Sequence, residues 1–312
     1  MNTPWDNPSD APVIEQSIHD YIVSIFRAQR GRRLEIVPIS PGAEASRGWD
    51  AAVLEVVPLF FQYKLPDFTS RPTKSQPQAA KFRKDIGFND DNGFFHFKLR
   101  KKAAKEPRSQ HELMLEMEKE GYAVYYVATD FIDNSRLRWG GDLHAGARPW
   151  ITRNHRVADE TKSFYDYLAP WFDGLICIPP FTEVSPPVEK HRFIYNNSLE
   201  VSLHSDPTQA YGAPLLQILA DQSFNFGTEL SITEKNVDRH VNFILSAIAG
   251  GAMSEKTFTA IEEYYNSLRP RSEEYRYSLM GKLRPLAHVI KTLVGIDVFF
   301  TARHKHGRPF RM

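Results

Sequence analysis

The stretch that most constrains the fold runs through residues 48–64, where Gly-Trp-Asp precedes an apolar run that ends in Phe-Phe-Gln-Tyr-Lys. Side chains alternate across a β-strand, so Gln62 and Lys64 are expected on the same face. An apolar run of this length is typical of a central strand that is covered on both faces, where an ammonium group is costly unless it is paired. Asp50 is expected on the adjoining strand, where its carboxylate would supply that pair.

Composition limits the class of protein. With 312 residues, 42% of them hydrophobic and 25% charged, the chain has the profile of a soluble globular protein of one large or two smaller domains. Cys177 is the only cysteine, which excludes an internal disulfide and fits a reducing compartment. The sequence has neither a membrane-spanning run nor a secretory signal pattern. We therefore expect a cytoplasmic protein with no membrane partner.

Positive charge is concentrated in one segment, although the net charge is only +1 and gives no global argument for a polyanionic partner. Residues 71–108 carry eleven basic side chains against four acidic ones. Such a segment is either a solvated loop or a surface that meets phosphate groups.

The order of predicted elements indicates an α/β fold with a mixed central sheet. A helix over 11–29, capped by Asp10, precedes strands over 33–39, 49–53 and 57–65. A basic insertion over 66–108 contains a loop with one short helix and a strand over 94–99. Ser109 then caps a helix over 110–120 that Gly121 closes, and a strand follows over 122–128. A helix between two strands is the usual parallel crossover.

The remaining chain divides less sharply. We expect a flexible leader over 1–10, a core over 11–135, a mixed α/β extension over 136–232 and a helical region over 233–312. The extension contains predicted strands over 175–178 and 192–203. The helical region contains predicted helices over 234–248, 254–268 and 273–294, followed by a basic tail over 303–311.

Four features together resemble the PD-(D/E)XK nuclease superfamily. They are Glu15 on the first helix, Asp50 at the start of the second strand, Gln62-Tyr63-Lys64 in the third strand and Gln110 on the helix that follows. The acidic residue before the lysine is replaced by glutamine, a variant that the superfamily contains. The resemblance covers about residues 11–130 and implies a restriction-endonuclease-like core.

The resemblance also implies a role for each residue. Asp50 would be the main carboxylate ligand of Mg²⁺ or Mn²⁺, and Gln62 would add its neutral amide oxygen. Lys64 would orient the attacking water and balance the phosphate charge. Glu15 would support the metal from the first helix, and Gln110 would contact the substrate backbone.

The implied activity is metal-dependent hydrolysis of phosphodiester bonds in DNA or RNA, as in bacterial restriction or antiviral systems. The residues expected to bind nucleic acid are Lys81, Arg83, Lys84, Lys98, Arg100, Lys101, Lys102 and Gln110. Two alternatives stay open at this point. A neutral Gln62 weakens Mg²⁺ binding, so the fold would bind nucleic acid or a protein partner without cutting. The helices of 234–294 would otherwise be the functional surface, binding a partner protein or a second copy.

Each candidate also has a structural alternative. Asp50 follows Gly-Trp as a turn residue entering a strand would, and Lys64 is equally a lysine that protects an edge strand. Glu15 suits the positive end of a helix dipole, and Gln110 suits a solvated first turn.

Overall fold

The computed structural model describes residues 15–27, 34–38, 53–70, 77–102, 108–132, 174–203, 206–222, 227–250 and 255–304. They form an α/β fold with one mixed sheet and one antiparallel sheet. The chain separates into two compact units, and each draws on distant stretches of sequence. The first unit spans residues 1–28, 63–99 and 126–220, and the second spans residues 29–62, 100–125 and 221–312.

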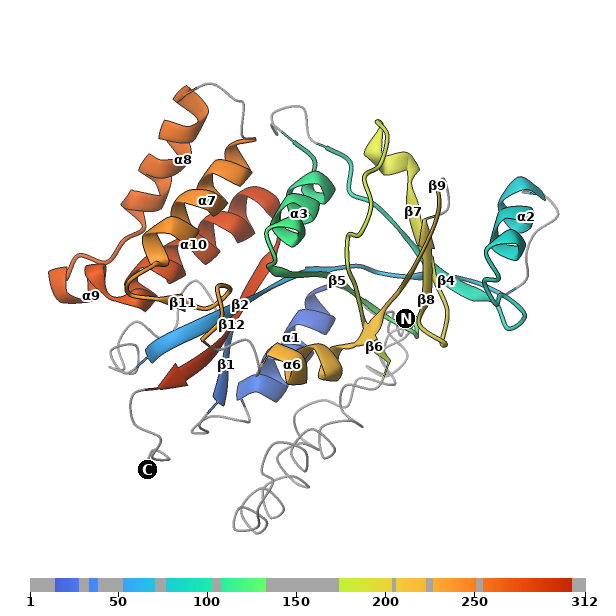
Figure 1. The fold of residues 1–312 in the computed structure, drawn as a ribbon, viewed down its shortest axis with the longest axis horizontal. Coiled ribbons are helices and arrows are strands. Elements are labelled where there is room, and N and C mark those ends of the chain that lie inside the picture. The colour runs from blue at the N-terminus through green and yellow to red at the C-terminus, as the bar shows by residue number, and fades with distance from the viewer. Residues whose placement is uncertain are drawn as a thin grey trace, which may run out of the picture. The chain divides into compact units, whose positions relative to one another are not determined.

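The strands of the second unit pair around β2 (Figure 1). They are β1 (Leu34–Pro38), β2 (Val53–Tyr63, with Tyr63 assigned to the first unit), β11 (Ile232–Thr233) and β12 (Asp297–His304). β12 lies between β1 and β2 and is antiparallel to both, with Phe300 opposite Val37 on one side and Pro58 on the other. β11 pairs with the beginning of β2. The C-terminal strand is therefore a central member of this sheet.

The second unit also contains helices that pack on one another. They are α3 (Gln110–Lys119), α7 (Val237–Ala249), α8 (Glu255–Ser267), α9 (Glu273–Tyr277) and α10 (Leu279–Val294), and α7, α8 and α10 lie side by side (Figure 1). Tyr122 stacks on Phe243 of α7 with 5.6 Å between ring centroids, and meets Phe60 of β2 edge-on at 5.7 Å. Burial of these rings from water fixes α7 against the strand.

The first unit contains most of β5 (Ala123–Thr129), together with β6 (Leu175–Ile178), β10 (Ala213–Pro214), α1 (Glu15–Arg27) and most of α6 (Leu215–Gln222). The Lys64 N–H donates to the Val127 carbonyl at 2.9 Å, which places the end of β2 beside β5. The strand order is β1-β12-β2-β5-β6-β10. Since the other neighbouring pairs are antiparallel, β2 and β5 are the parallel pair of this mixed sheet.

A second, antiparallel sheet lies wholly in the first unit. Its strands follow the order β3 (Asp67–Thr69), β4 (Phe94–Lys98), β7 (Arg192–Tyr195), β8 (Glu200–Leu203) and β9 (Asp206–Tyr211), and the short η4 (Val188–Lys190) leads into β7. One face is aromatic, with Phe97 stacked on Phe193 at 5.4 Å and both rings 5.4 Å from that of Tyr126. This face forms the core of the first unit.

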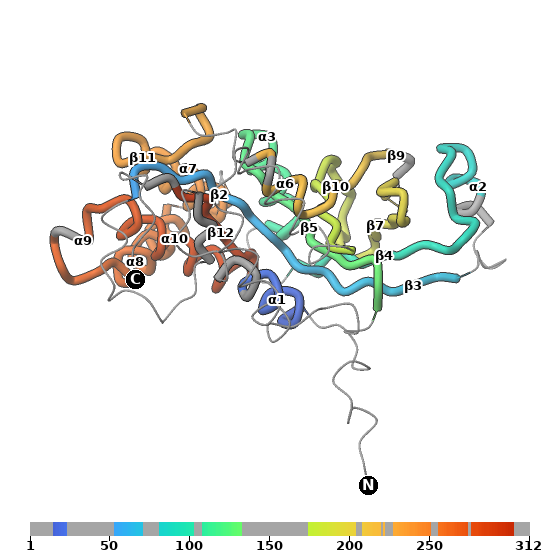
Figure 2. The backbone as a smooth tube through the Cα atoms, turned by 90° about the horizontal axis from the view of Figure 1, so that it is seen from below, coloured from blue at the N-terminus to red at the C-terminus, as the bar shows by residue number. Residues whose placement is uncertain are grey.

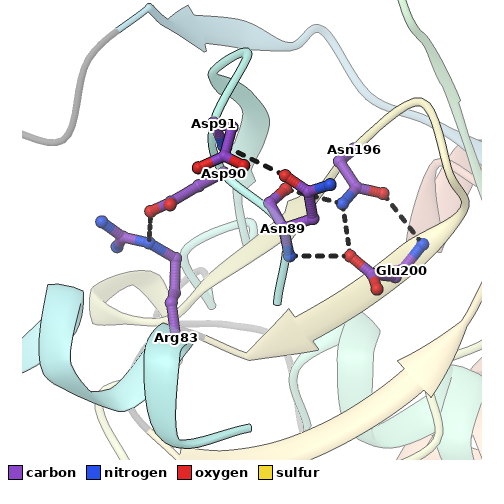
Figure 3. Close-up of polar contacts among 6 residues, drawn as sticks. All are labelled: Arg83, Asn89, Asp90, Asp91, Asn196 and Glu200. Carbon is purple, nitrogen blue, oxygen red and sulfur yellow. Dashed lines mark hydrogen bonds and ion pairs between the residues drawn. The ribbon is translucent and has the colours of Figure 1, made fainter. Parts of the chain in front are cut away.

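The opposite face of the antiparallel sheet is partly covered by α2 (Pro77–Asp85) and the turn that follows it, where Phe88 packs on Phe94 and Ile194. Figures 1 and 2 both show α2 at one end of this sheet. At that end, Asn89, Asn196 and Glu200 bond to one another and Arg83 pairs with Asp90 (Figure 3).

Most predicted elements of the core are confirmed within a few residues, and the fold class is α/β with a mixed sheet as expected. The expected separate strands over 49–53 and 57–65 are wrong in part, because residues 53–63 form one unbroken strand. β12, of which only residues 303–304 fall in the expected basic tail, pairs with residues 53–61 of β2, and residues 49–52 lie outside the described residues.

Two further expectations need correction. The single strand over 192–203 is a hairpin, β7 and β8, because Asn196 bonds the backbone N–H groups of Ser198 and Glu200 and so turns the chain. The helix over 273–294 is two helices, since Ser278 adopts an extended backbone and caps α10 by accepting from the Gly281 N–H.

Candidate active site

β2 positions the first candidate residues because it is buried along nearly its whole length. Every residue of the strand except Leu54 is buried, as the continuous apolar pattern predicts for a central strand. Near its end, Gln62 is 7% exposed, and Lys64 just beyond it is 6% exposed. The two polar side chains thus lie in surroundings where each needs partners.

α3 positions Gln110 at its first turn. The Ser109 side chain accepts from the Glu112 N–H, and the Glu112 carboxylate accepts from the Ser109 N–H, so a capping box fixes the start of the helix. Gln110 is 4% exposed, which excludes the solvated first-turn position considered from the sequence. Its side chain points into the second unit instead.

A buried amide pair links α3 to β2 within the second unit. Gln110 Nε2 donates to Gln62 Oε1, and it also donates to the Val294 carbonyl at 2.6 Å. Arg100 Nη1 donates to the same carbonyl at 3.0 Å. Gly295, with φ of +74°, ends α10 at this point, and an added Cβ would lie 3.4 Å from Arg100 Nη1. The end of α10 therefore joins the residues around Gln62.

The Lys64 side chain is described within the first unit. Its ammonium lies 5.5 Å from the centroid of the Tyr126 ring, within the range of a cation–π contact. Tyr126 is fully buried, and burial raises the pKa of its phenol well above the usual value. The ring stays neutral, so its face remains available to the cation. On the preceding residue, Tyr63 meets His19 of α1 edge-on at 5.6 Å.

The predicted metal ligands are only partly placed. Glu15 is the first residue of α1 and is exposed, whereas Asp50 lies outside the described residues. Within the described ranges, no group of three or more His, Cys, Asp or Glu side chains could hold a metal ion. The Gln62 oxygen already accepts from Gln110, so the described donors alone do not make a Mg²⁺ site, which requires carboxylate oxygens.

The predicted nucleic-acid residues differ in exposure. Six of them are exposed: Lys81, Lys84, Lys98, Arg100, Lys101 and Lys102. Arg83 is buried, its Nε donates to Asp90 Oδ2 at 2.8 Å and its guanidinium lies 4.5 Å from the Phe94 ring centroid (Figure 3). That guanidinium is therefore engaged inside the first unit. Gln110 is buried, and its described contacts are to protein groups.

The sequence analysis did not predict that the Val294 carbonyl would accept from Gln110 or that Gly295 would end α10 beside it. The usable signal was the glycine directly after the predicted helix over 273–294, since a glycine there commonly ends a helix in the left-handed conformation. Nothing in the sequence indicated that the carbonyl before it would accept from Gln110.

Comparisons with protein-family models, with curated proteins and with solved structures found no match to this chain. None of the helices in the described ranges combines the length and apolar character needed to span a bilayer.

Proposed function

We propose that this protein is a metal-dependent nuclease with a restriction-endonuclease-like core, acting on DNA or RNA. The observation that carries the proposal is a buried lysine two residues beyond a buried glutamine on a central strand. Both Gln62 and Lys64 are less than a tenth exposed. A buried ammonium group needs partners, and buried ionisable groups cluster at functional sites, so a lysine directly after this strand motivates a chemical role.

The order of elements adds support. Helix α1, strand β2, helix α3 and strand β5 follow one another with insertions between them, and β2 and β5 are parallel neighbours. Gln110 lies at the start of α3 and bonds Gln62 of β2. A strand carrying the lysine, followed by a helix whose side chain reaches that strand, is consistent with the superfamily that the sequence resembles.

In the proposed site, Asp50 and Gln62 would hold Mg²⁺ or Mn²⁺. When bound, the metal would lower the pKa of a water molecule and offset the charge of the phosphate. Lys64 would keep its ammonium beside the scissile phosphate, with the Tyr126 ring limiting its positions. Gln110 would orient the Gln62 amide so that its oxygen has a fixed direction.

Cleavage assays on labelled single- and double-stranded DNA and RNA with Mg²⁺ or Mn²⁺ test the proposal. We expect Asp50→Asn and Lys64→Met each to lower the cleavage rate by about a hundredfold or more. Lys64→Met keeps the length of the side chain and should leave the protein folded. Lys256→Met, at an exposed position on α8, is the matched control and should cleave like wild type. Absence of cleavage by wild type, or equal rates for Lys64→Met and the control, would contradict the proposal.

A second candidate function is binding of nucleic acid without cleavage. The specific observation in its favour is that Gln62 Oε1 already accepts from Gln110 Nε2, which leaves this neutral ligand with reduced capacity for a cation. Calorimetric titration with Mn²⁺ separates the two candidates. A nuclease site should bind the ion and lose it in Asp50→Ala, whereas a binding protein should show no Asp50-dependent uptake.

A further inference from the structure

Two cations lie directly opposite each other on neighbouring strands of the antiparallel sheet in the first unit. In the register of β4 and β7, Lys98 lies directly opposite Arg192. Lys98 is exposed and Arg192 is half-buried, and neither side chain forms an ion pair or a hydrogen bond that is described. Like charges directly opposite in a sheet are destabilising. This pair therefore opposes the stability of the fold without a compensating partner among the described residues.

The two cations project from the face opposite the core. Residues opposite each other share a face, and residues two apart on one strand do so as well. Lys98, His96 and Arg192 thus lie on one face, while Phe97 and Phe193 lie on the other and pack with Tyr126. α2 and the turn after it cover the face at Phe94 and Ile194, whereas Lys98, at the other end of β4, is exposed.

The Glu200 carboxylate of the same sheet is held elsewhere. The Glu200 carboxylate accepts from the Asn89 N–H at 2.9 Å and from Asn196 Nδ2 at 2.5 Å, at the covered end (Figure 3). Arg192 lies four residues before Asn196 on the chain, or about 13 Å along an extended strand, which exceeds the screening length at physiological salt. Glu200 is thus too distant to neutralise the pair.

Asp67 is the acid closest in register. It lies opposite His96, and 3.8 Å separates its Oδ2 from His96 Nδ1. Burial lowers the pKa of His96, Asp67 opposes this change, and Arg192 and Lys98 lower the pKa further. The charges of Lys98 and Arg192 therefore both reach His96. On this part of the face the Asp67 carboxylate carries one negative charge, and the two cations carry two permanent positive charges.

We propose that Lys98 and Arg192 form a docking surface for the phosphate backbone of a nucleic acid on the outer face of the antiparallel sheet. A polyanion would remove the repulsion between the two cations and release counterions. Lys81 and Lys84 of α2, in the same unit, are further exposed cations, which favours an extended polyanion over a single phosphate. The choice of nucleic acid as the ligand rests on the proposed function. The observation that Lys98 lies opposite Arg192 is independent of that function.

Fluorescence anisotropy with labelled single- and double-stranded oligonucleotides tests the docking surface. Measurements in EDTA, from about 50 to about 200 mM salt, separate binding from cleavage. We expect Lys98→Gln/Arg192→Gln to bind about tenfold more weakly at the lowest salt and to reduce the slope of log K against log salt by up to about 2. The melting temperature of this variant should be unchanged or higher, because the repulsion is removed.

Lys235→Gln/Lys256→Gln is the matched control, since both lysines are exposed in the second unit and the same net charge is lost. Its affinity should stay within about twofold of wild type. An unchanged affinity of Lys98→Gln/Arg192→Gln overturns the proposal, as does an equal loss in the control. An equal loss of binding to polyglutamate would overturn the assignment of nucleic acid as the occupant.

The same variants separate this proposal from the nuclease proposal. If Lys98→Gln/Arg192→Gln loses binding in EDTA and wild type never cleaves, the docking surface stands and the nuclease proposal fails. If wild type cleaves and the variant binds and cleaves equally well, the docking surface fails and the nuclease proposal stands.

Discussion

Gln110 and Gln62, 48 residues apart in the chain, are joined by a buried hydrogen bond from Nε2 of the first to Oε1 of the second. The Val294 carbonyl fixes this orientation, since it can only accept and therefore requires the nitrogen of Gln110. Gln62 consequently presents its oxygen toward α3. This pair ties the start of a helix, the end of a central strand and the end of α10 within the second unit.

Replacement of Gln110 should destabilise the protein. Gln110→Ala leaves the Gln62 oxygen and the Val294 carbonyl without this donor, and we expect a loss of about 1–3 kcal/mol in the free energy of unfolding. Gln16→Ala, on the exposed side of α1, removes a glutamine that bonds Asp20 at the surface and should change stability by less than about 0.5 kcal/mol. Urea unfolding of both variants gives the comparison. Equal effects would show that the buried pair does not stabilise the fold.

The turn between β7 and β8 allows a second comparison of a buried with an exposed residue, here Asn196 and Asn197. Asn196 is 5% exposed, donates to the Asn89 carbonyl at 2.8 Å and accepts from the Ser198 N–H at 3.0 Å. Asn196→Ala should cost about 1–3 kcal/mol in urea unfolding, because these buried groups lose their partner. The neighbouring Asn197 is exposed, and Asn197→Ala should cost less than about 0.5 kcal/mol. A larger loss at Asn197 would contradict the hydrogen-bond arrangement in Figure 3.

Gly87 and Gly93, which follow α2, allow the energetic cost of backbone strain to be measured separately from that of steric overlap. Gly87 and Gly93 have φ of +72° and +88°, so alanine at either should cost about 1–2 kcal/mol. An added Cβ at Gly87 meets nothing within 4 Å, whereas at Gly93 it would lie 2.5 Å from the Thr69 carbonyl oxygen. Gly93→Ala should therefore lower the free energy of unfolding by about 1–3 kcal/mol more than Gly87→Ala does. Thermal or urea unfolding that ranks the two variants equally would exclude the close approach of β3.

His240 should make stability depend on pH. Burial lowers its pKa to about 4, with a further lowering from Arg239, and its Nδ1 lies 2.7 Å from the Tyr122 hydroxyl. An unfolded histidine titrates near its usual pKa of about 6.5, so the unfolded chain binds more protons between these values and stability falls as pH is lowered through that window. The slope from this one group should approach about 1.4 kcal/mol per pH unit.

Urea unfolding at several pH values from about 7.5 to about 4.5 measures the slope of the free energy of unfolding against pH. His240→Gln should flatten it, since glutamine does not titrate. His288→Gln, on α10, should keep the wild-type slope because the contact between Tyr122 and His240 is intact. A slope that survives in His240→Gln would assign the pH dependence to other groups.

Local sequence signals predicted much of the core. Ser109 and Gly121 defined α3 because caps depend on residues within one turn of the helix ends. The burial of Gln62 and Lys64 followed from the apolar run around them. In contrast, the pairing of β2 with β12, from the far end of the chain, was not predicted.

The candidate site was predicted in part for the same reason. Residue types and strand alternation indicated Gln62 and Lys64, which lie close together in the chain. The contacts to Val294 and Tyr126 could not be predicted, because each partner comes from a different element. The proposed role of Asp50 stays a prediction, since Asp50 lies outside the described residues.

The sequence alone determined the N-cap of α3, the buried central strand and the α/β character, because these depend on short-range periodicity and on the energetics of burial. Only the tertiary structure decided that β12 pairs with β2, that Gln110 bonds Gln62 and that Lys98 opposes Arg192. Strand register and side-chain pairing arise from the packing of residues distant in the chain. Many pairings satisfy the same local pattern, and the packed core selects one of them.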